Sequence, residues 1–184
     1  MSIARSGVIV AVLALAACGS DPVVTPTTES ALSSSPAPVS RPSELSLTGV
    51  DACSLLTDTQ LDQLKVNSKP RKTAEGCSFD ADLTKPYYSY GVTPVAADLE
   101  AWVSGDRRKS SMTVEPVQVD GFPALRNYRA SADPSDCETL VGVAKGQTMV
   151  VQAFPVSGGF GQQQLCDMSQ QAAELALRTL KARP

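Results

Sequence analysis

Hydrophobic and polar residues alternate with a period of two in several short stretches of the chain, a pattern typical of half-buried strands. Asp120-Gly121 and Lys145-Gly146 each separate two such stretches and predict tight turns. Pro116 marks an edge strand or a bulge, because proline has no N–H to give to a neighbouring strand. The predicted strands are 76–80, 87–92, 112–119, 124–129, 137–144 and 147–154. We therefore expect an antiparallel sheet of five to six strands.

The period changes to that of a helix at the C-terminal end of the chain. Apolar and small residues recur at helical spacing from Leu165 to Leu180, and they include Ala172, Ala173 and Ala176. This broad stripe predicts a long amphipathic helix that lies on the sheet.

Two shorter helices are predicted earlier in the chain. Thr57 and Gln60 match a capping box, so the first helix begins after Thr57. Thr93 as N-cap and Gly105 after the last turn bound the second helix, whose apolar face holds Trp102 as an expected core anchor. Together the patterns predict an α+β domain in which the C-terminal helix and the two shorter helices pack against the antiparallel sheet.

The N-terminal residues have the pattern of an export signal. Arg5 supplies the positive charge, and the apolar run 8–17 is too short to cross a bilayer, which needs about 20 residues. The run ends in the letters LAAC, whose cysteine is Cys18, and this resembles the lipobox of bacterial lipoproteins. We expect residues 1–17 to be a signal peptide and Cys18 to be the lipidation site. The alternative is a plain secretory signal in which Cys18 is incidental.

The segment after the lipobox has a different composition from the rest of the chain. Residues 18–46 are rich in Ser, Thr and Pro and have no sustained apolar periodicity. Such a segment does not bury enough surface to offset its chain entropy, so we expect a disordered tether. The expected organisation is thus a tether that holds a folded domain, residues 47–184, at the outer face of a bacterial cytoplasmic membrane.

Four further cysteines lie within the predicted domain. An exported chain folds in an oxidising compartment, so we expect Cys53, Cys77, Cys137 and Cys166 to form two structural disulfides. Three pairings are possible, and we favour Cys53–Cys77 and Cys137–Cys166 because each joins neighbouring elements. No CxxC is present, which argues against a thioredoxin-like redox site and a zinc site.

Three short motifs follow one another in a characteristic order. They are Asp51-Ala52-Cys53-Ser54-Leu55-Leu56-Thr57, Gly76-Cys77-Ser78-Phe79 and Val119-Asp120-Gly121-Phe122-Pro123-Ala124. With Cys137 opening a strand and Cys166 opening the last helix, residues 50–182 resemble the actinobacterial lipoproteins grouped as domain of unknown function 3558. Ala52 departs from that family, which tends to have proline there. The resemblance implies a lipid-anchored envelope protein with two disulfides; it implies no established activity and no catalytic residues.

Composition excludes several kinds of chemistry. The chain contains no histidine, so it lacks the base of Ser/His/Asp and Cys/His catalysis. Its net charge of −3 gives no basic field for nucleic acid. We predict no cofactor and no metal site.

Two basic clusters and one aromatic strand are candidate contact sites. The clusters follow the two shorter helices and comprise Lys69, Arg71 and Lys72, and Arg107, Arg108 and Lys109. If the fold joined them, they would form a patch for an anionic lipid or envelope polymer; the alternative is two separate solvated loops. Tyr88 and Tyr90 share one face of a predicted strand and would form a binding surface if that face were uncovered. The alternative is ordinary packing.

The function expected from these features is a non-catalytic binding or interaction module whose partner is an envelope protein, a cell-wall polymer or a lipid. The alternative is a carrier or sensor of an apolar small molecule or lipid held between the sheet and the last helix, where small side chains can leave room. That alternative requires a cavity of about 300 Å³ or more. An unrecognised envelope enzyme is a third hypothesis. The oligomeric state stays open.

Overall fold

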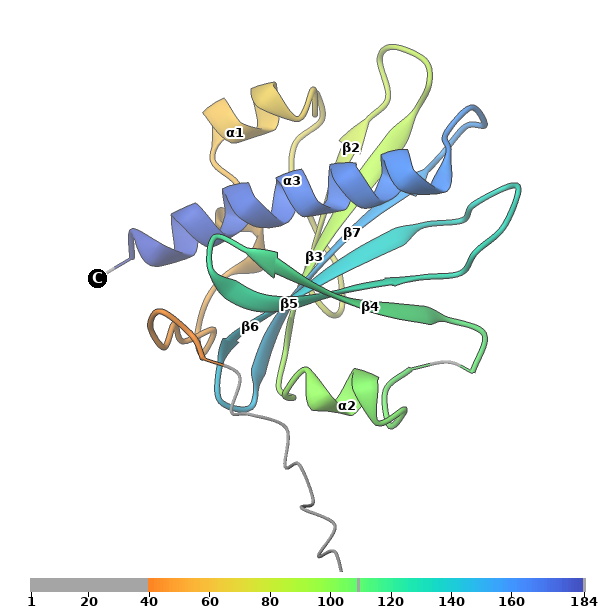
Figure 1. Cartoon of the computed structure of the whole chain (residues 1–184). Helices are drawn as coiled ribbons and strands as arrows, with labels where there is room; N and C mark the ends of the chain where they lie inside the picture. Colours follow the sequence, from red (N-terminus) through yellow and green to blue (C-terminus); the bar gives the residue numbers. More distant parts are fainter. Residues whose placement is uncertain (1–39, 109, 184) are drawn as a thin grey trace, which may run out of the picture. The chain divides into compact units, whose positions relative to one another are not determined.

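The computed structural model describes residues 40–108 and 110–183, which form a seven-stranded antiparallel sheet with a long helix across one face (Figure 1). The strand order is β1-β2-β3-β7-β6-β5-β4. The strands are β1 (Arg71–Lys72), β2 (Cys77–Ala81), β3 (Tyr88–Val95), β4 (Thr113–Val119), β5 (Phe122–Tyr128), β6 (Cys137–Ala144) and β7 (Gln147–Pro155). The helices are η1 (Ala52–Ser54), α1 (Asp58–Gln63), α2 (Glu100–Val103) and α3 (Gln162–Lys181). The predicted α+β class is confirmed.

The main core lies between α3 and the sheet. Alternate residues of the central strands face α3 and are buried there, among them Phe79, Val92, Val141, Met149 and Val151. The helix meets them with its predicted stripe of small and apolar residues. Because Ala52 of η1 and Leu61 of α1 belong to the same cluster, the segment before the sheet is part of the core.

A second, smaller core lies on the opposite face of the sheet. Trp102 of α2 packs there against Leu125, Leu140 and Val150. Trp102 is only 6% exposed, which confirms its expected role as a core anchor. The remainder of this face carries mostly polar side chains.

Both disulfides form with the favoured pairing. Cys53–Cys77 joins η1 to β2, and Cys137–Cys166 joins β6 to α3. The paired cysteines are 24 and 29 residues apart. Closing loops of this length contributes about 3–4 kcal/mol each in the chain-entropy model.

Both predicted turns are present, and the sheet has one strand more than expected. Asp120 and Gly121 have φ values of 48° and 81°, the left-handed conformation of a two-residue hairpin turn. The additional strand, β1, is an edge strand of two exposed residues, Arg71 and Lys72. Two exposed residues show no alternation of burial, so hydrophobic periodicity does not reveal such a strand.

The predicted start of the second helix is wrong. Thr93 and Val95 belong to β3, where they pair with β7, and α2 spans only Glu100–Val103. The backbone hydrogen bonds of this long strand pair outweigh the local preference of Thr93 for an N-cap. Pro94 is tolerated because β2 pairs with β3 only as far as Val92.

Ordered contacts begin before residue 47, where the domain was expected to start. Arg41 Nε donates to the carbonyl of Gly142 at 3.0 Å, and the Leu45 amide donates to the carbonyl of Val143 at 2.9 Å. The predicted signal peptide, Cys18 and most of the tether lie outside the described residues. Within the described part, no helix has the length and apolar character needed to cross a membrane.

Candidate functional site

The strongest candidate site is a pocket of about 450 Å³ between one end of the sheet and α3. We call it the tyrosine pocket. Its walls are the end of α1 with the following loop, the β2–β3 hairpin, Phe160 and the first half of α3. The lining residues are Leu64, Lys65, Asn67, Ala81, Thr84, Lys85, Pro86, Tyr88, Tyr90, Phe160, Gln164, Met168 and Gln171. The volume lies in the range of small-molecule sites.

Three aromatic rings meet in the tyrosine pocket. The ring centroids of Tyr88 and Tyr90 are 5.6 Å apart with an interplanar angle of 84°. Those of Tyr88 and Phe160 are 5.7 Å apart at 78°. These edge-to-face contacts are a favourable ring geometry. The three rings are therefore held in place by contacts with one another.

The two tyrosines share one face of β3, as the alternation predicts, but this is the face beneath α3. Tyr90 is 2% exposed and packs in the main core, and Tyr88 is half-buried at its margin. Tyr88 and Tyr90 therefore do not form an open sheet surface, because α3 covers this face and both residues line the wall of a pocket. The sequence gives the face of each residue, but it does not say which face α3 covers.

The phenol groups of the two tyrosines differ in their hydrogen bonds. Tyr88 Oη donates to the carbonyl of Leu64 at 2.9 Å. The Tyr90 hydroxyl has no hydrogen-bond partner among the described residues. Burial raises the pKa of both phenols, so both are neutral at physiological pH. The Tyr90 O–H thus remains as a donor at the pocket.

The wall formed by α1 ends in a Schellman motif. The Lys65 amide donates to the carbonyl of Asp62 at 3.0 Å, and the Val66 amide donates to that of Leu61 at 2.9 Å. Lys65 occupies the left-handed position of this motif with φ of 56°, where glycine is favoured by roughly 1 kcal/mol. The chain thus places a lysine on the pocket wall in a backbone conformation that is unfavourable for lysine.

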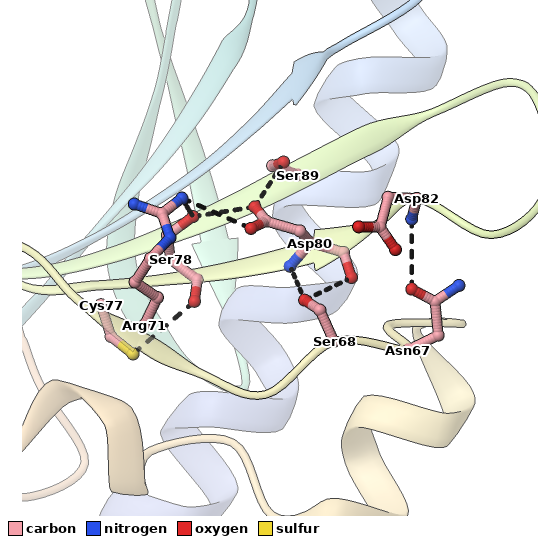
Figure 2. Close-up of polar contacts among 8 residues, drawn as sticks. All are labelled: Asn67, Ser68, Arg71, Cys77, Ser78, Asp80, Asp82 and Ser89. Atoms are coloured by element: carbon pink, nitrogen blue, oxygen red, sulfur yellow. Dashed lines mark hydrogen bonds and ion pairs between the residues drawn. The ribbon is translucent and has the colours of Figure 1, made fainter.

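A polar network attaches the same wall to the edge of the sheet (Figure 2). Ser68 Oγ accepts the Asp80 amide at 3.2 Å and donates to the Asp80 carbonyl at 3.0 Å. Asn67 Oδ1 accepts the Asp82 amide at 3.1 Å. The loop that carries Lys65 and Asn67 is therefore fixed to β2 at two points.

The Asp80 carboxylate completes this network. It accepts hydrogen bonds from Ser89 Oγ at 2.7 Å and Ser78 Oγ at 3.0 Å, and it pairs with Arg71 at 3.4 Å (Figure 2). Burial by itself raises the pKa of this carboxyl, but these three donors together lower it below its usual value. Asp80 is therefore ionised at neutral pH and organises the strand edge beside the pocket.

Gln60 holds the α1 wall against α3. Its Oε1 accepts the Thr57 amide at 2.8 Å, which is one half of the predicted capping box. The same side chain donates to the carbonyl of Leu175 at 3.0 Å and accepts from Thr179 Oγ1 at 3.0 Å. The capping residue thus also sets the position of α1 along α3.

The α3 wall is anchored by the second disulfide. Cys137 and Cys166 form a buried cluster with Phe160 and Leu165 at the start of the helix. From this anchored turn, Gln164 and Gln171 reach the pocket as exposed side chains. Neither amide makes a hydrogen bond with a described residue. The α1 and α3 walls of the tyrosine pocket are therefore held by contacts within the protein, while the amides of Gln164 and Gln171 have no hydrogen-bond partner among the described residues.

The charged residues that line the tyrosine pocket are both lysines. Lys65 and Lys85 are exposed, and neither forms an ion pair with a described residue. Lys85 Nζ lies 5.8 Å from the centroid of the Tyr87 ring. No aspartate or glutamate is among the described lining residues. The pocket margin is thus cationic on a chain whose net charge is −3.

The first predicted basic cluster lies at the edge of the sheet and faces carboxylates. Arg71 pairs with Asp80 at 3.4 Å, and Lys72 pairs with Asp51 at 2.8 Å. The Lys72 ammonium also holds the pKa of the Asp51 carboxyl below its usual value. Lys69 is exposed in the loop before β1.

The second predicted basic cluster lies after α2. The Arg107 guanidinium carbon is 5.7 Å from the centroid of the Trp102 ring, and Arg108 is half-buried. Lys109 lies outside the described residues. No contact between the two clusters is present in the described part of the chain, and the joint anionic-partner patch stays a prediction.

Three hollows occupy the polar part of the sheet face opposite α3, which we call the open face. Their volumes are about 530, 450 and 350 Å³, and Phe154 lines all three. Arg71 borders two of them and Arg107 the third. Asn127 lines the largest, and its Oδ1 is buried without a hydrogen-bond partner among the described residues. The open face is the second candidate site.

Several pocket residues carry no signal in the sequence. Gln164 and Gln171 read as the polar face of an amphipathic helix. Lys65 follows the predicted helix without a glycine to mark the left-handed position. Within residues 40–108 and 110–183, no three His, Cys, Asp or Glu side chains are placed to hold a metal ion.

Comparison with known proteins identifies a family. A family model described as "Protein of unknown function (DUF3558)" matches residues 13–179. No curated protein and no solved structure matches the chain.

Proposed function

Because the chain belongs to the DUF3558 family, whose function is unknown, we propose a function from its own site. We propose that it is a non-catalytic, lipid-anchored binding module at the outer face of a bacterial cytoplasmic membrane. Its ligand is a small amphipathic molecule that enters the tyrosine pocket. This proposal takes up the alternative of a carrier or sensor, but with an amphipathic ligand in the tyrosine pocket in place of an apolar one beneath the small residues of α3.

One observation carries this proposal: contacts within the protein hold the rings and the walls of the pocket in place. Its rings are fixed by edge-to-face contacts, and its walls are fixed by Gln60, Ser68 and the Cys137–Cys166 disulfide. A site that needs little reordering loses less conformational entropy when it binds. The pocket is lined by both apolar and polar side chains, and such a mixture is typical of small-molecule sites.

The lining chemistry favours binding over catalysis. Rings, amides, lysines and hydroxyls face the tyrosine pocket, and no described lining residue is a carboxylate or a thiol. The chain also has no histidine to act as a general base. Recognition of a ligand requires only the groups that are present.

Attachment to the membrane is proposed to occur through acylated Cys18, which lies outside the described residues. Two or more acyl chains give stable membrane attachment, whereas one chain gives only marginal binding. In an actinobacterial host, Cys18→Ala is expected to move the protein from the membrane fraction to the culture medium or the wash. Equal membrane retention of Cys18→Ala and the unchanged chain would contradict a lipid anchor at this residue.

Native mass spectrometry tests the ligand proposal. The full chain is purified from envelopes of an actinobacterial host, and we expect an added mass that disappears on denaturation, unlike a covalent acyl group. Gln164→Trp fills the tyrosine pocket from the surface of α3 and is expected to abolish that mass. Gln163→Trp, at the neighbouring exposed position that does not line the pocket, is expected to retain it. No releasable mass, or an equal mass on both variants, would count against the proposal.

A second candidate function, contact with a cell-wall glycan, is favoured by the open face. Its hollows combine the rings of Phe154 and Trp102 with planar polar side chains such as Asn127 and Gln152, and its arginines are accompanied by carboxylates. Aromatic and planar polar groups can stack on and hydrogen-bond to an uncharged sugar chain. Phe154→Ala is expected to reduce co-sedimentation with purified cell walls, with Leu83→Ala, at an exposed position that lines none of the three hollows, as the control. Equal sedimentation of both variants would reject this candidate.

A further inference from the structure

The proposed ligand of the tyrosine pocket has one further feature that the geometry defines. We infer that it is an organic acid: an apolar or ring-containing body lies against Tyr88, Tyr90 and Phe160, and its anionic group is held by Lys65 and Lys85. This inference rests on the proposed function and adds the chemical class of the ligand.

The first argument is the distribution of charge. The whole chain carries an acidic excess, yet the two charged residues that line this pocket are lysines. Five of the twelve other described lysines and arginines pair with a carboxylate, as Arg71, Lys72 and Arg126 do. Lys65 and Lys85 have no such partner among the described residues. An anionic group at the pocket supplies the missing counter-charge.

The second argument is the backbone of Lys65. Its φ of 56° is a conformation that glycine or asparagine adopts more readily than lysine. An ordinary Schellman motif is best served by glycine at this position, so lysine is unfavourable for the fold alone. Residues in such sparsely populated conformations are concentrated at binding sites. The strained conformation thus places the Lys65 side chain at the margin of the tyrosine pocket.

The third argument is the set of neutral donors beside the lysines. The Tyr90 hydroxyl and the amides of Gln164 and Gln171 have no hydrogen-bond partner among the described residues. An acid group carries several acceptor oxygens and can use an ammonium and neutral donors together. A neutral apolar ligand would leave the buried Tyr90 O–H unpaired.

Two dyes with nearly the same skeleton test the inference. Anilinonaphthalene sulfonate and phenylnaphthylamine share the naphthyl-phenylamine body, and only the first carries an acid. We expect the unchanged full chain to bind the sulfonate dye at least about tenfold more tightly, with the difference shrinking as salt rises. In the Lys65→Gln/Lys85→Gln variant the sulfonate dye is expected to bind about tenfold more weakly, with the neutral dye unchanged. Lys69→Gln, in the same exposed loop, is the control and is expected to alter neither.

Failure of the inference and failure of the proposed function give different results. If the double lysine variant leaves the ratio of the two affinities unchanged while Gln164→Trp weakens both dyes, the pocket binds ligands without recognising an acid. The inference is then overturned and the proposed function stands. If Gln164→Trp alters neither dye, both are overturned. Far-UV circular dichroism confirms that each variant is folded, which exposed positions should allow.

The source of the acid is distinguished by competition against the sulfonate dye. Displacement by a short-chain phosphatidylglycerol, used as a monomer, supports a lipid headgroup as the natural acid. Displacement by naphthoate and not by that lipid supports a free organic acid. Displacement by neither compound at saturating concentration would overturn the inference.

Discussion

The two halves of the interface between α3 and the sheet are built differently. In the second half of the helix, Ala172, Ala173, Ala176 and Leu177 are fully buried in the main core. In the first half, the helix residues beside the β2–β3 hairpin line the tyrosine pocket. One helix therefore closes the core with its second half and lines a ligand-sized pocket with its first half.

The difference shows what small side chains do beneath a helix. In the carrier or sensor alternative, Ala172, Ala173 and Ala176 leave room for a ligand, but in the structure they let the helix approach the sheet, and the space is filled. Protein interiors tolerate few voids, so a helix settles until its small residues are in contact. The pocket forms instead where the helix presents long polar side chains, which do not pack into a core.

The largest effect is expected from an added side chain at the filled end. Ala173→Leu inserts methylene groups into a close-packed region and should lower the free energy of unfolding by about 1–3 kcal/mol. Gln171→Leu adds the same side chain beside the pocket and should change stability by no more than about 0.5 kcal/mol. Urea unfolding compares the two variants. Equal destabilisation would show that the two halves of the interface do not differ in packing.

A smaller effect, of opposite sign, is expected at the pocket wall. Lys65→Gly removes the left-handed strain and should raise the free energy of unfolding by about 1 kcal/mol. It should also weaken binding of the sulfonate dye by as much as Lys65→Gln does, although Lys65→Gln keeps the strained backbone conformation. The same urea and dye titrations measure both quantities. If glycine leaves the free energy of unfolding unchanged or lowers it, the left-handed conformation of Lys65 does not destabilise the fold.

The smallest effect concerns the network that fixes the loop of this wall. The pKa of the Asp80 carboxyl is lower in the folded chain than in the unfolded chain, where it is about 3.9. The ionised carboxylate therefore stabilises the fold above about pH 3.9, and this contribution is lost as the pH falls through the lowered pKa of the folded state. Asp80→Asn should therefore reduce stability at neutral pH by less than about 1 kcal/mol, because the ion pair is partly solvated. The difference from the unchanged chain should vanish in strong acid. A difference that is constant from neutral pH to strong acid would contradict an ionised Asp80 as its origin.

How far the sequence predicts each feature depends on how local its cause is. The hairpin at Asp120-Gly121 and the capping box at Thr57 follow from neighbouring residues and are confirmed. The helix predicted from Thr93 is wrong because pairing with β7 is a distant interaction. The tyrosine pocket combines segments more than 80 residues apart in sequence, such as Lys65 and Gln164. No local pattern indicates that these segments meet.

The methionine methyl groups provide the most direct test of the central claim, which is that the ligand occupies the tyrosine pocket. Met168 lines that pocket, Met112 lines a hollow of the open face, and Met149 is buried in the core. In the methyl-labelled protein, titration with the sulfonate dye and then with a solvent extract of actinobacterial envelopes should shift the Met168 resonance and leave those of Met112 and Met149 in place. A shift of Met112 without Met168 would place binding on the open face. An unchanged Met168 resonance at saturating dye would contradict the account.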